Sequence, residues 1–196
     1  MTEAHPPERP TEARPTEARP PERPTEAGPT EARPTERPTE ARPTDARPPE
    51  RPTRVLFLCT GNSARSILAE ALLRRIGGAA FEVHSAGTQP RGLHPLTLRV
   101  LSEAGIPTDG LRSKSVTDYV EQRFDYLVTL CDEAREACPV FPGRHTVLHW
   151  GQPDPAAAVG HAEERLAAFR RARDAIRARV ESFVAGVERG GVAAGG

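Results

Sequence analysis

The chain has 196 residues, and its 27 Lys and Arg balance its 27 Asp and Glu, so its formal net charge at neutral pH is zero. The sequence has no basic block typical of a nucleic-acid surface, no apolar run of the roughly 20 residues needed to span a membrane, and no apolar stretch of a signal peptide. We therefore expect a cytoplasmic monomer that binds neither nucleic acid nor membrane.

Residues 1–53 form a degenerate repeat of Pro-Thr-Glu-Ala-Arg and hold 14 of the 21 prolines. The segment has no aromatic residue, Val, Ile, Leu or Cys. It cannot bury enough apolar surface to offset the entropy of ordering, so we interpret it as a disordered tail. Its role stays open between a spacer or docking segment, a tail without function, and sequence upstream of a true start near residue 50.

Residues 54–187 have the composition and length of one globular domain, followed by a flexible C-terminal tail at 188–196. In chain order, apolar spacing and Gly or Pro punctuation predict a strand at 54–59, a helix at 66–78, a strand at 81–87, a helix at 94–106, strands at 124–131 and 145–150, and a helix at 161–187. This alternation predicts an α/β fold, a three-layer sandwich with a four-stranded parallel sheet flanked by helices.

The last predicted helix has one apolar side, formed by Leu166, Phe169, Ile176, Val180 and Phe183. In parallel sheets, ligands bind beyond the carboxyl ends of the strands. Cys59 and Cys131 each end a predicted strand, and the sequence Trp-Gly-Gln-Pro-Asp-Pro at 150–155 follows the fourth. We therefore expect these three segments to meet at one edge of the sheet.

The stretch Cys-Thr-Gly-Asn-Ser-Ala-Arg-Ser at 59–66 joins the first strand to the first helix. A loop of this length can turn its amide groups inward, and the helix N-terminus adds partial positive charge, so the loop predicts an anion-binding nest. Arg65 adds a planar set of donors that matches a tetrahedral oxyanion, and the same field favours the thiolate of Cys59. The predicted oxyanion-binding residues are Thr60, Gly61, Asn62, Ser63, Ala64 and Arg65.

Two further residues have the chemistry that such a thiolate needs. The Ser66 hydroxyl can donate a hydrogen bond to the thiolate and help it leave. Asp154, in the Asp-Pro that follows the fourth strand, is the predicted proton donor at the mouth of the site, with Asp132 as a competitor.

Cys131 and Cys138 lie seven positions apart. In a helix this spacing separates them by about 10.5 Å along the axis. A disulfide requires Cα atoms roughly 4.4–6.8 Å apart, so the two cysteines can bond only if the segment unwinds. The histidines show no metal-ligand spacing with these cysteines, so we expect no metal site. Zinc bound by Cys131 and Cys138 is a weaker alternative.

Together, these motifs resemble the low-molecular-weight protein tyrosine phosphatase superfamily, and within it the thioredoxin-coupled arsenate reductases. The resemblance covers residues 54–187 and rests on the loop at 59–66, on "VTLCDEAREACP" and on "HWGQPDPA". It implies that Cys59 attacks arsenate, that Cys131 resolves the adduct, and that Cys138 then forms a disulfide with Cys131. It also implies an external reductant, thioredoxin or a small thiol such as mycothiol, and no bound cofactor. Phosphate and sulfate are expected to compete with arsenate.

The sequence departs from that family pattern at two positions. Ala64 stands where some of the reductases have a further cysteine, which the relay does not require. Some members bind a monovalent cation at positions that match Asn62, Glu70 and Ser85, and the remaining acidic ligand aligns with Lys114. We hypothesise that the Lys114 ammonium replaces the cation and pairs with Glu70.

Two other functions remain as alternatives. A low-molecular-weight protein tyrosine phosphatase would hydrolyse phosphate monoesters through a phosphocysteine at Cys59, but Ala156, Ala157 and Ala158 stand where its aromatic residues would stack on the phenol ring. An oxyanion-binding regulator without catalysis would need neither Asp154 nor the pair Cys131 and Cys138.

Overall fold

The computed structural model describes residues 51–190. The tail predicted at 1–53 lies outside this range except for its last three residues, and most of the tail predicted at 188–196 lies outside it as well. Within the described part, the first strand begins at Thr53 and the last helix ends at Glu188.

A four-stranded sheet forms the centre of the domain. Its strands are β1 (Thr53–Cys59), β2 (Phe81–Gly87), β3 (Tyr126–Thr129) and β4 (Thr146–His149), in the order β2-β1-β3-β4 and all parallel. The predicted α/β fold with a four-stranded parallel sheet is confirmed. The third and fourth strands are shorter than predicted. Backbone hydrogen bonds nevertheless continue beyond β3 at both ends, because the Asp125 amide donates to the Arg54 carbonyl at 2.9 Å and the Leu130 amide donates to the Leu58 carbonyl at 2.8 Å.

The helices are α1 (Arg65–Gly77), α2 (Pro95–Glu103), α3 (Asp132–Glu136) and α4 (Ala162–Glu188), with single 3-10 turns at η1 (Gly78–Ala80), η2 (Val116–Tyr119) and η3 (Pro155–Ala157). α2 ends three residues earlier than predicted because Gly105 adopts φ +64° and the Ile106 amide turns back to the Leu101 carbonyl at 3.0 Å. Among the described helices, none combines the length and the apolar character of a membrane-spanning segment.

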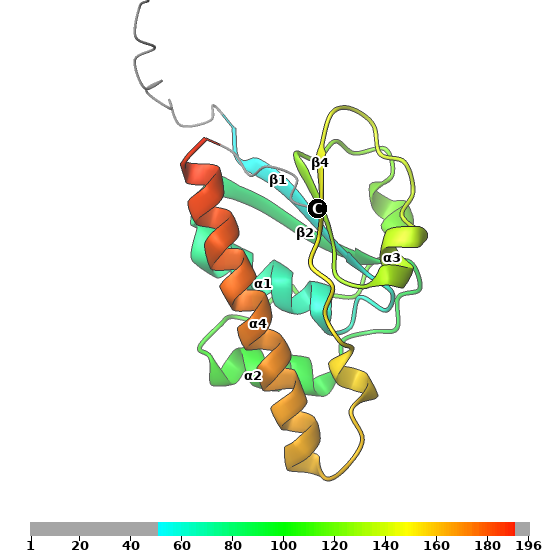
Figure 1. The fold of residues 1–196 in the computed structure, drawn as a ribbon, viewed down its shortest axis with the longest axis vertical. Helices are drawn as coiled ribbons and strands as arrows, with labels where there is room; N and C mark the ends of the chain where they lie inside the picture. Colours follow the sequence, from blue (N-terminus) through cyan, green and yellow to red (C-terminus); the bar gives the residue numbers. More distant parts are fainter. Residues whose placement is uncertain (1–50, 191–196) are drawn as a thin grey trace, which may run out of the picture. The chain divides into compact units, whose positions relative to one another are not determined.

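The helices lie on both sides of the sheet. α1 and α4 pack against each other on one side, with α2 alongside them, and α3 lies on the other (Figure 1). On the α4 side, Phe183 packs its ring against Phe81, Tyr126 and Trp150, at centroid distances of 5.8, 4.9 and 5.8 Å. All five apolar residues predicted to form one side of α4 are buried. This packing fixes the strands, and hence the loops at their carboxyl ends.

Candidate active site

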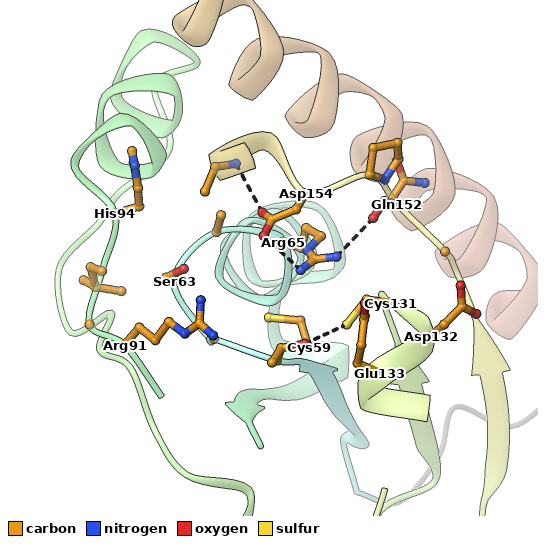
Figure 2. A pocket seen from close by; sticks show the side chains of 18 of the residues that line it. Cys59, Ser63, Arg65, Arg91, His94, Cys131, Asp132, Glu133, Gln152 and Asp154 are labelled. Atoms are coloured by element: carbon orange, nitrogen blue, oxygen red, sulfur yellow. Dashed lines mark hydrogen bonds and ion pairs between the residues drawn. The ribbon is translucent and has the colours of Figure 1, made fainter. Parts of the chain in front are cut away.

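An open cleft of about 1000 Å³ lies at the carboxyl edge of the sheet. Its walls come from the loop after β1, from the residues after β3 and from the segment after β4, so the three predicted segments do converge. Cys59, Arg65, Cys131 and Asp154 all line it (Figure 2). Residues that lie far apart in the sequence therefore line the same cleft.

The loop after Cys59 is held from outside by the segment that follows β2. The carbonyls of Thr60, Gly61 and Ser63 accept hydrogen bonds from the amides of residues 89, 91 and 94, at 2.8, 2.9 and 3.1 Å. Within residues 51–190, the amides of residues 61–65 have no protein acceptor. The loop thus has its carbonyls tied back and its amides available to an anion, which is the arrangement of a nest.

Asn62 fixes the curvature of this loop. It is fully buried and adopts φ 41°, a left-handed conformation that Asn tolerates better than most residues. Its side-chain nitrogen donates hydrogen bonds to the hydroxyls of Ser66 and Ser85, both at 2.8 Å. Its side-chain oxygen accepts a hydrogen bond from the backbone amide of Lys114 at 2.7 Å. One side chain therefore joins the loop to α1, to β2 and to the chain after β2.

The Cys59 sulfur lies 2.9 Å from the Ser66 hydroxyl oxygen, and both residues are buried. Because Ser66 already accepts a hydrogen bond from Asn62, its own hydrogen is free to point at the sulfur. The predicted Cys59–Ser66 contact is therefore present, in a geometry suited to stabilising a thiolate at the end of β1.

Arg65 and Asp154 meet across the cleft. One terminal nitrogen of Arg65 donates to the Gln152 carbonyl at 3.2 Å, and the other lies 3.4 Å from an Asp154 carboxylate oxygen. The other Asp154 oxygen accepts a hydrogen bond from the Ala156 amide at 3.2 Å, which caps η3. The segment after β4 thus holds both the guanidinium and the predicted acid at the mouth of the site.

Cys131 and Cys138 lie at the two ends of α3, and both are free thiols. Cys131 is the residue before the helix, is buried and lies 3.4 Å from the Thr60 hydroxyl oxygen. Cys138 follows the helix, is half-buried and is absent from the cleft wall. Burial raises the pKa of the Cys138 thiol. The structure thus places one of these two cysteines in the cleft and the other outside it.

Asp132, the competing acid, also lines the cleft but faces different partners. Its carboxylate lies 3.1 Å from Arg135 and 3.4 Å from His149, and its side chain is mostly exposed. Asp154, by contrast, is the carboxylate in contact with Arg65.

The residues of the predicted cation site also meet, beneath the loop. The Lys114 ammonium lies 2.9 Å from the fully buried Glu70 carboxylate, which also accepts a hydrogen bond from Ser85. Arg74, which the sequence reasoning did not include, is a second cation on Glu70, and its i,i+4 spacing on α1 could have revealed it. Residues 51–190 contain no cluster of three or more His, Cys, Asp or Glu arranged to hold a metal ion.

Several residues in and around the site escaped the sequence reasoning, among them Gly87, Arg91 and His94. Gly87 lies so close to the loop that an added Cβ would be 2.6 Å from the Thr60 carbonyl oxygen. Arg91 and His94 line the cleft. Burial is the main cause that lowers the pKa of His94, and Arg165 adds to it. No local sequence pattern marks these residues. The one available signal is that they lie at or beyond the end of β2, which is the strand next to the one that carries Cys59.

This site and fold define a phosphatase-type family. The chain belongs to the low molecular weight phosphotyrosine protein phosphatase family, whose model matches residues 54–192. Among its relatives, an arsenate reductase from Halalkalibacterium halodurans is 40% identical over 129 residues, which cover 66% of this chain and 93% of that one.

Solved structures give the same picture. One similar structure is a thioredoxin-dependent arsenate reductase from Corynebacterium glutamicum, with 30% identity and a TM-score of 0.51 over 68% of this chain and 64% of that one. Another is an arsenate reductase from Archaeoglobus fulgidus, with 30% identity and a TM-score of 0.55 over 67% of this chain and 98% of that one. The resemblance seen in the sequence is thereby confirmed.

Proposed function

We propose that this protein reduces arsenate to arsenite through a relay of three cysteine thiols. One observation carries the proposal: Cys59 and Cys131 line the same cleft, and Cys138 lies just beyond the five-residue helix that starts after Cys131. A hydrolase would need the first cysteine alone.

The first step is attack on the arsenic by Cys59. Arsenate binds to the free amides of residues 61–65 and to the Arg65 guanidinium. The Cys59 thiolate forms a sulfur–arsenic bond, and one hydroxyl group of the arsenate leaves as water after Asp154 gives it a proton. The arsenic is still pentavalent at this stage.

The second step transfers the electrons. The Cys131 thiolate attacks the Cys59 sulfur, a Cys59–Cys131 disulfide forms and the sulfur–arsenic bond breaks. The electron pair of that bond stays with arsenic, which leaves as trivalent arsenite. The two thiols together have lost two electrons, and arsenic has gained two.

The third step moves the disulfide out of the cleft. The Cys138 thiolate attacks Cys131, Cys59 leaves as a thiolate, and a Cys131–Cys138 disulfide remains. Because α3 separates these two residues, it has to unwind for the bond to form. An external dithiol then reduces the disulfide. We propose thioredoxin for this role, with support from the relative of Corynebacterium glutamicum that is described as thioredoxin-dependent.

The cleft wall supports a reductase more than an aryl phosphatase. Within the described residues, no Phe, Tyr or Trp side chain lines the cleft, and Ala156 is the lining residue that follows Asp154-Pro155. A phosphotyrosine ring would find no aromatic surface to stack on. Arsenate has no ring and needs none.

Below the loop, the proposed role of Lys114 is to take the place of a monovalent cation. Its ammonium satisfies the buried Glu70 carboxylate, while its backbone amide holds Asn62. The charge that supports the loop is then part of the chain itself, so activity should not depend on added potassium.

The test is a coupled assay of NADPH oxidation with arsenate, thioredoxin and thioredoxin reductase. Cys59→Ser, Cys131→Ser and Cys138→Ser should each abolish turnover. A Cys138→Ser protein that still turns over with thioredoxin would exclude the three-cysteine relay and favour a small thiol as reductant.

Hydrolysis of p-nitrophenyl phosphate is the matched control, because it needs the Cys59 loop but not the relay. Cys131→Ser and Cys138→Ser should retain whatever weak hydrolysis the wild type shows, and Cys59→Ser should lose it. Strong phosphatase activity without arsenate-dependent NADPH oxidation in the wild type would establish the hydrolase instead.

A further inference from the structure

Arg91 is a cation of the cleft to which the proposed relay gives no role. It lies on the segment after β2, and its amide donates to the Gly61 carbonyl at 2.9 Å. Its side chain runs along Gly61: the Cδ and Cγ atoms lie 3.5 and 3.7 Å from the position that a Cβ on that glycine would take. Figure 2 shows the guanidinium pointing into the cleft, toward Cys59 and Ser63.

The two arginines of the cleft differ in their partners. Arg65 is engaged by the Gln152 carbonyl and by the Asp154 carboxylate. Within residues 51–190, the Arg91 guanidinium has neither a hydrogen-bond acceptor nor an ion-pair partner. Arg91 therefore presents a full positive charge and five donors to whatever enters the cleft.

The position of Arg91 selects the kind of ligand. Figure 2 shows Arg91 on one side of Cys59, and Cys131, Asp132 and Glu133 on the other. The reductant has to reach the Cys131–Cys138 pair on that other side. The anion that Cys59 attacks lies between the two sides, over the loop that Arg91 borders.

We propose that Arg91 is a second anion-binding residue, which attracts a divalent tetrahedral oxyanion into the nest and contacts it on the side away from Cys131. The proposal deepens the proposed function, on which it rests for the identity of arsenate as the reacting anion. The binding chemistry is shared by arsenate, phosphate and sulfate. Each of them would lie between two guanidinium groups, one from α1 and one from the segment after β2.

The physical effect is on affinity rather than on bond making. A charge at the rim of a cleft raises the local concentration of an oppositely charged ligand, and it does so less at high salt. Loss of Arg91 should therefore raise the KM for arsenate and leave kcat at saturating arsenate nearly unchanged.

The experiment measures anion binding separately from turnover. Titration calorimetry of the full-length reduced protein with inorganic phosphate and with sulfate gives the affinity, and the coupled assay gives kcat and KM for arsenate. The variants are Arg91→Gln, Arg91→Lys and, as a control, Arg75→Gln. Arg75 is an exposed arginine near the opposite end of α1 from the loop.

For Arg91→Gln we expect anion affinity to fall about tenfold at low salt, with a weaker dependence on salt than in the wild type. Arg91→Lys should retain most of the affinity, and Arg75→Gln should match the wild type. Unchanged phosphate and sulfate affinity in Arg91→Gln would overturn the inference.

Two other outcomes separate the inference from the proposed function. A raised KM for thioredoxin with unchanged anion affinity would assign Arg91 to the reductant and overturn the inference. Arg91-dependent anion binding in a protein that does not reduce arsenate would refute the proposed function and leave the inference standing.

Discussion

The loop at 59–66 and the segment at 131–138 both carry cysteines of the proposed relay, but they are built in opposite ways. In the loop, Asn62 and Ser66 are fully buried, and the chain after β2 donates three hydrogen bonds to loop carbonyls. In the segment, α3 has five residues, of which Ala134 alone is buried. The first region is tied to neighbouring elements by many hydrogen bonds, whereas the second contacts the rest of the protein chiefly through the buried Cys131 and Ala134 and the ion pair of Asp132 with His149.

This difference matches the tasks proposed for the two regions. The nest has to keep its shape while an anion binds and reacts, because misplaced donors lose transition-state stabilisation. The segment has to change shape, because Cys131 and Cys138 cannot bond across an intact helix. A change that loosens the loop or stiffens the segment should therefore impair the protein in different steps.

Lys114→Met should give the largest effect on stability. It removes the ammonium from a fully buried Glu70 and leaves Arg74 as the remaining cation there. Breaking a buried ion pair typically costs about 3 kcal/mol or more, so urea unfolding should show a loss near that value.

Potassium provides the control for this variant. The wild type should show no gain in melting temperature or turnover with added potassium, whereas Lys114→Ala, which opens space beside Glu70, should recover part of both. Strong potassium activation of the wild type would contradict the idea that Lys114 replaces the cation.

Gly87→Ala should displace the loop at 59–66, with which the added methyl group would be in direct contact. The added methyl group would lie 2.6 Å from the Thr60 carbonyl oxygen and 2.9 Å from both the Asn62 amide and its Cβ, so the loop has to move. Displacement of a catalytic loop by about 1 Å can lower turnover about 100-fold. The measurement is kcat/KM for arsenate.

The redox equilibrium of the Cys131–Cys138 pair serves as the internal control in the same protein. It should stay close to the wild-type value in Gly87→Ala, because the three atoms nearest to the added methyl group belong to Thr60 and Asn62 and none belongs to residues 131–138. Normal turnover, or a large change in that equilibrium, would show that the two regions are not independent.

In the folded, reduced protein, the reaction of Cys138 with an alkylating reagent should keep rising beyond the pH at which an ordinary thiol levels off. Burial raises its pKa, because the charged thiolate is disfavoured away from water. Its alkylation by iodoacetamide, followed in a Cys59→Ser/Cys131→Ser protein, should rise about tenfold per pH unit and continue to rise beyond the ordinary thiol pKa of about 8.5. A plateau at or below that value would show that the thiol is not held in an apolar environment.

The same raised pKa has a consequence for stability, and its sign is fixed. The folded protein holds the Cys138 proton more tightly than the unfolded chain does. This contribution to the free energy of unfolding is therefore fully present below the unfolded-state pKa and is lost as the pH rises through the folded-state pKa.

Arg135→Gly should have the smallest effect, and it tests the comparison in the segment at 131–138. Glycine in place of an ordinary residue weakens a helix by about 1 kcal/mol, so the reduced, helical form of the segment loses stability and the disulfide gains about fivefold in its equilibrium with dithiothreitol. Arg135→Ala is the matched control, because it removes the same ion pair with Asp132 but keeps helix propensity. Equal equilibria for both variants would mean that the helix does not oppose the bond.

The sequence predicted those parts of the site that are written in neighbouring residues. The spacing of Cys59 and Arg65, the Asp-Pro after the fourth strand and the two later cysteines are local patterns, and a parallel sheet brings strand ends together by its topology. Gly87 and Arg91 were missed because their importance comes from contacts with the loop some 25 to 30 positions earlier in the chain. The early end of α2 was missed because Gly105 in its left-handed conformation acts together with the returning Ile106 amide.

The hydrogen bonds of Asn62 also bear on where the entropy of the loop is lost. All its partners, Ser66, Ser85 and Lys114, belong to the chain itself, so protein contacts specify the shape of the loop. The conformational entropy of residues 59–66 is then lost during folding rather than during anion binding. Phosphate, sulfate and arsenate therefore bind to the same preformed loop. The protein discriminates between them by how each anion reacts with Cys59, and not by how far the loop closes.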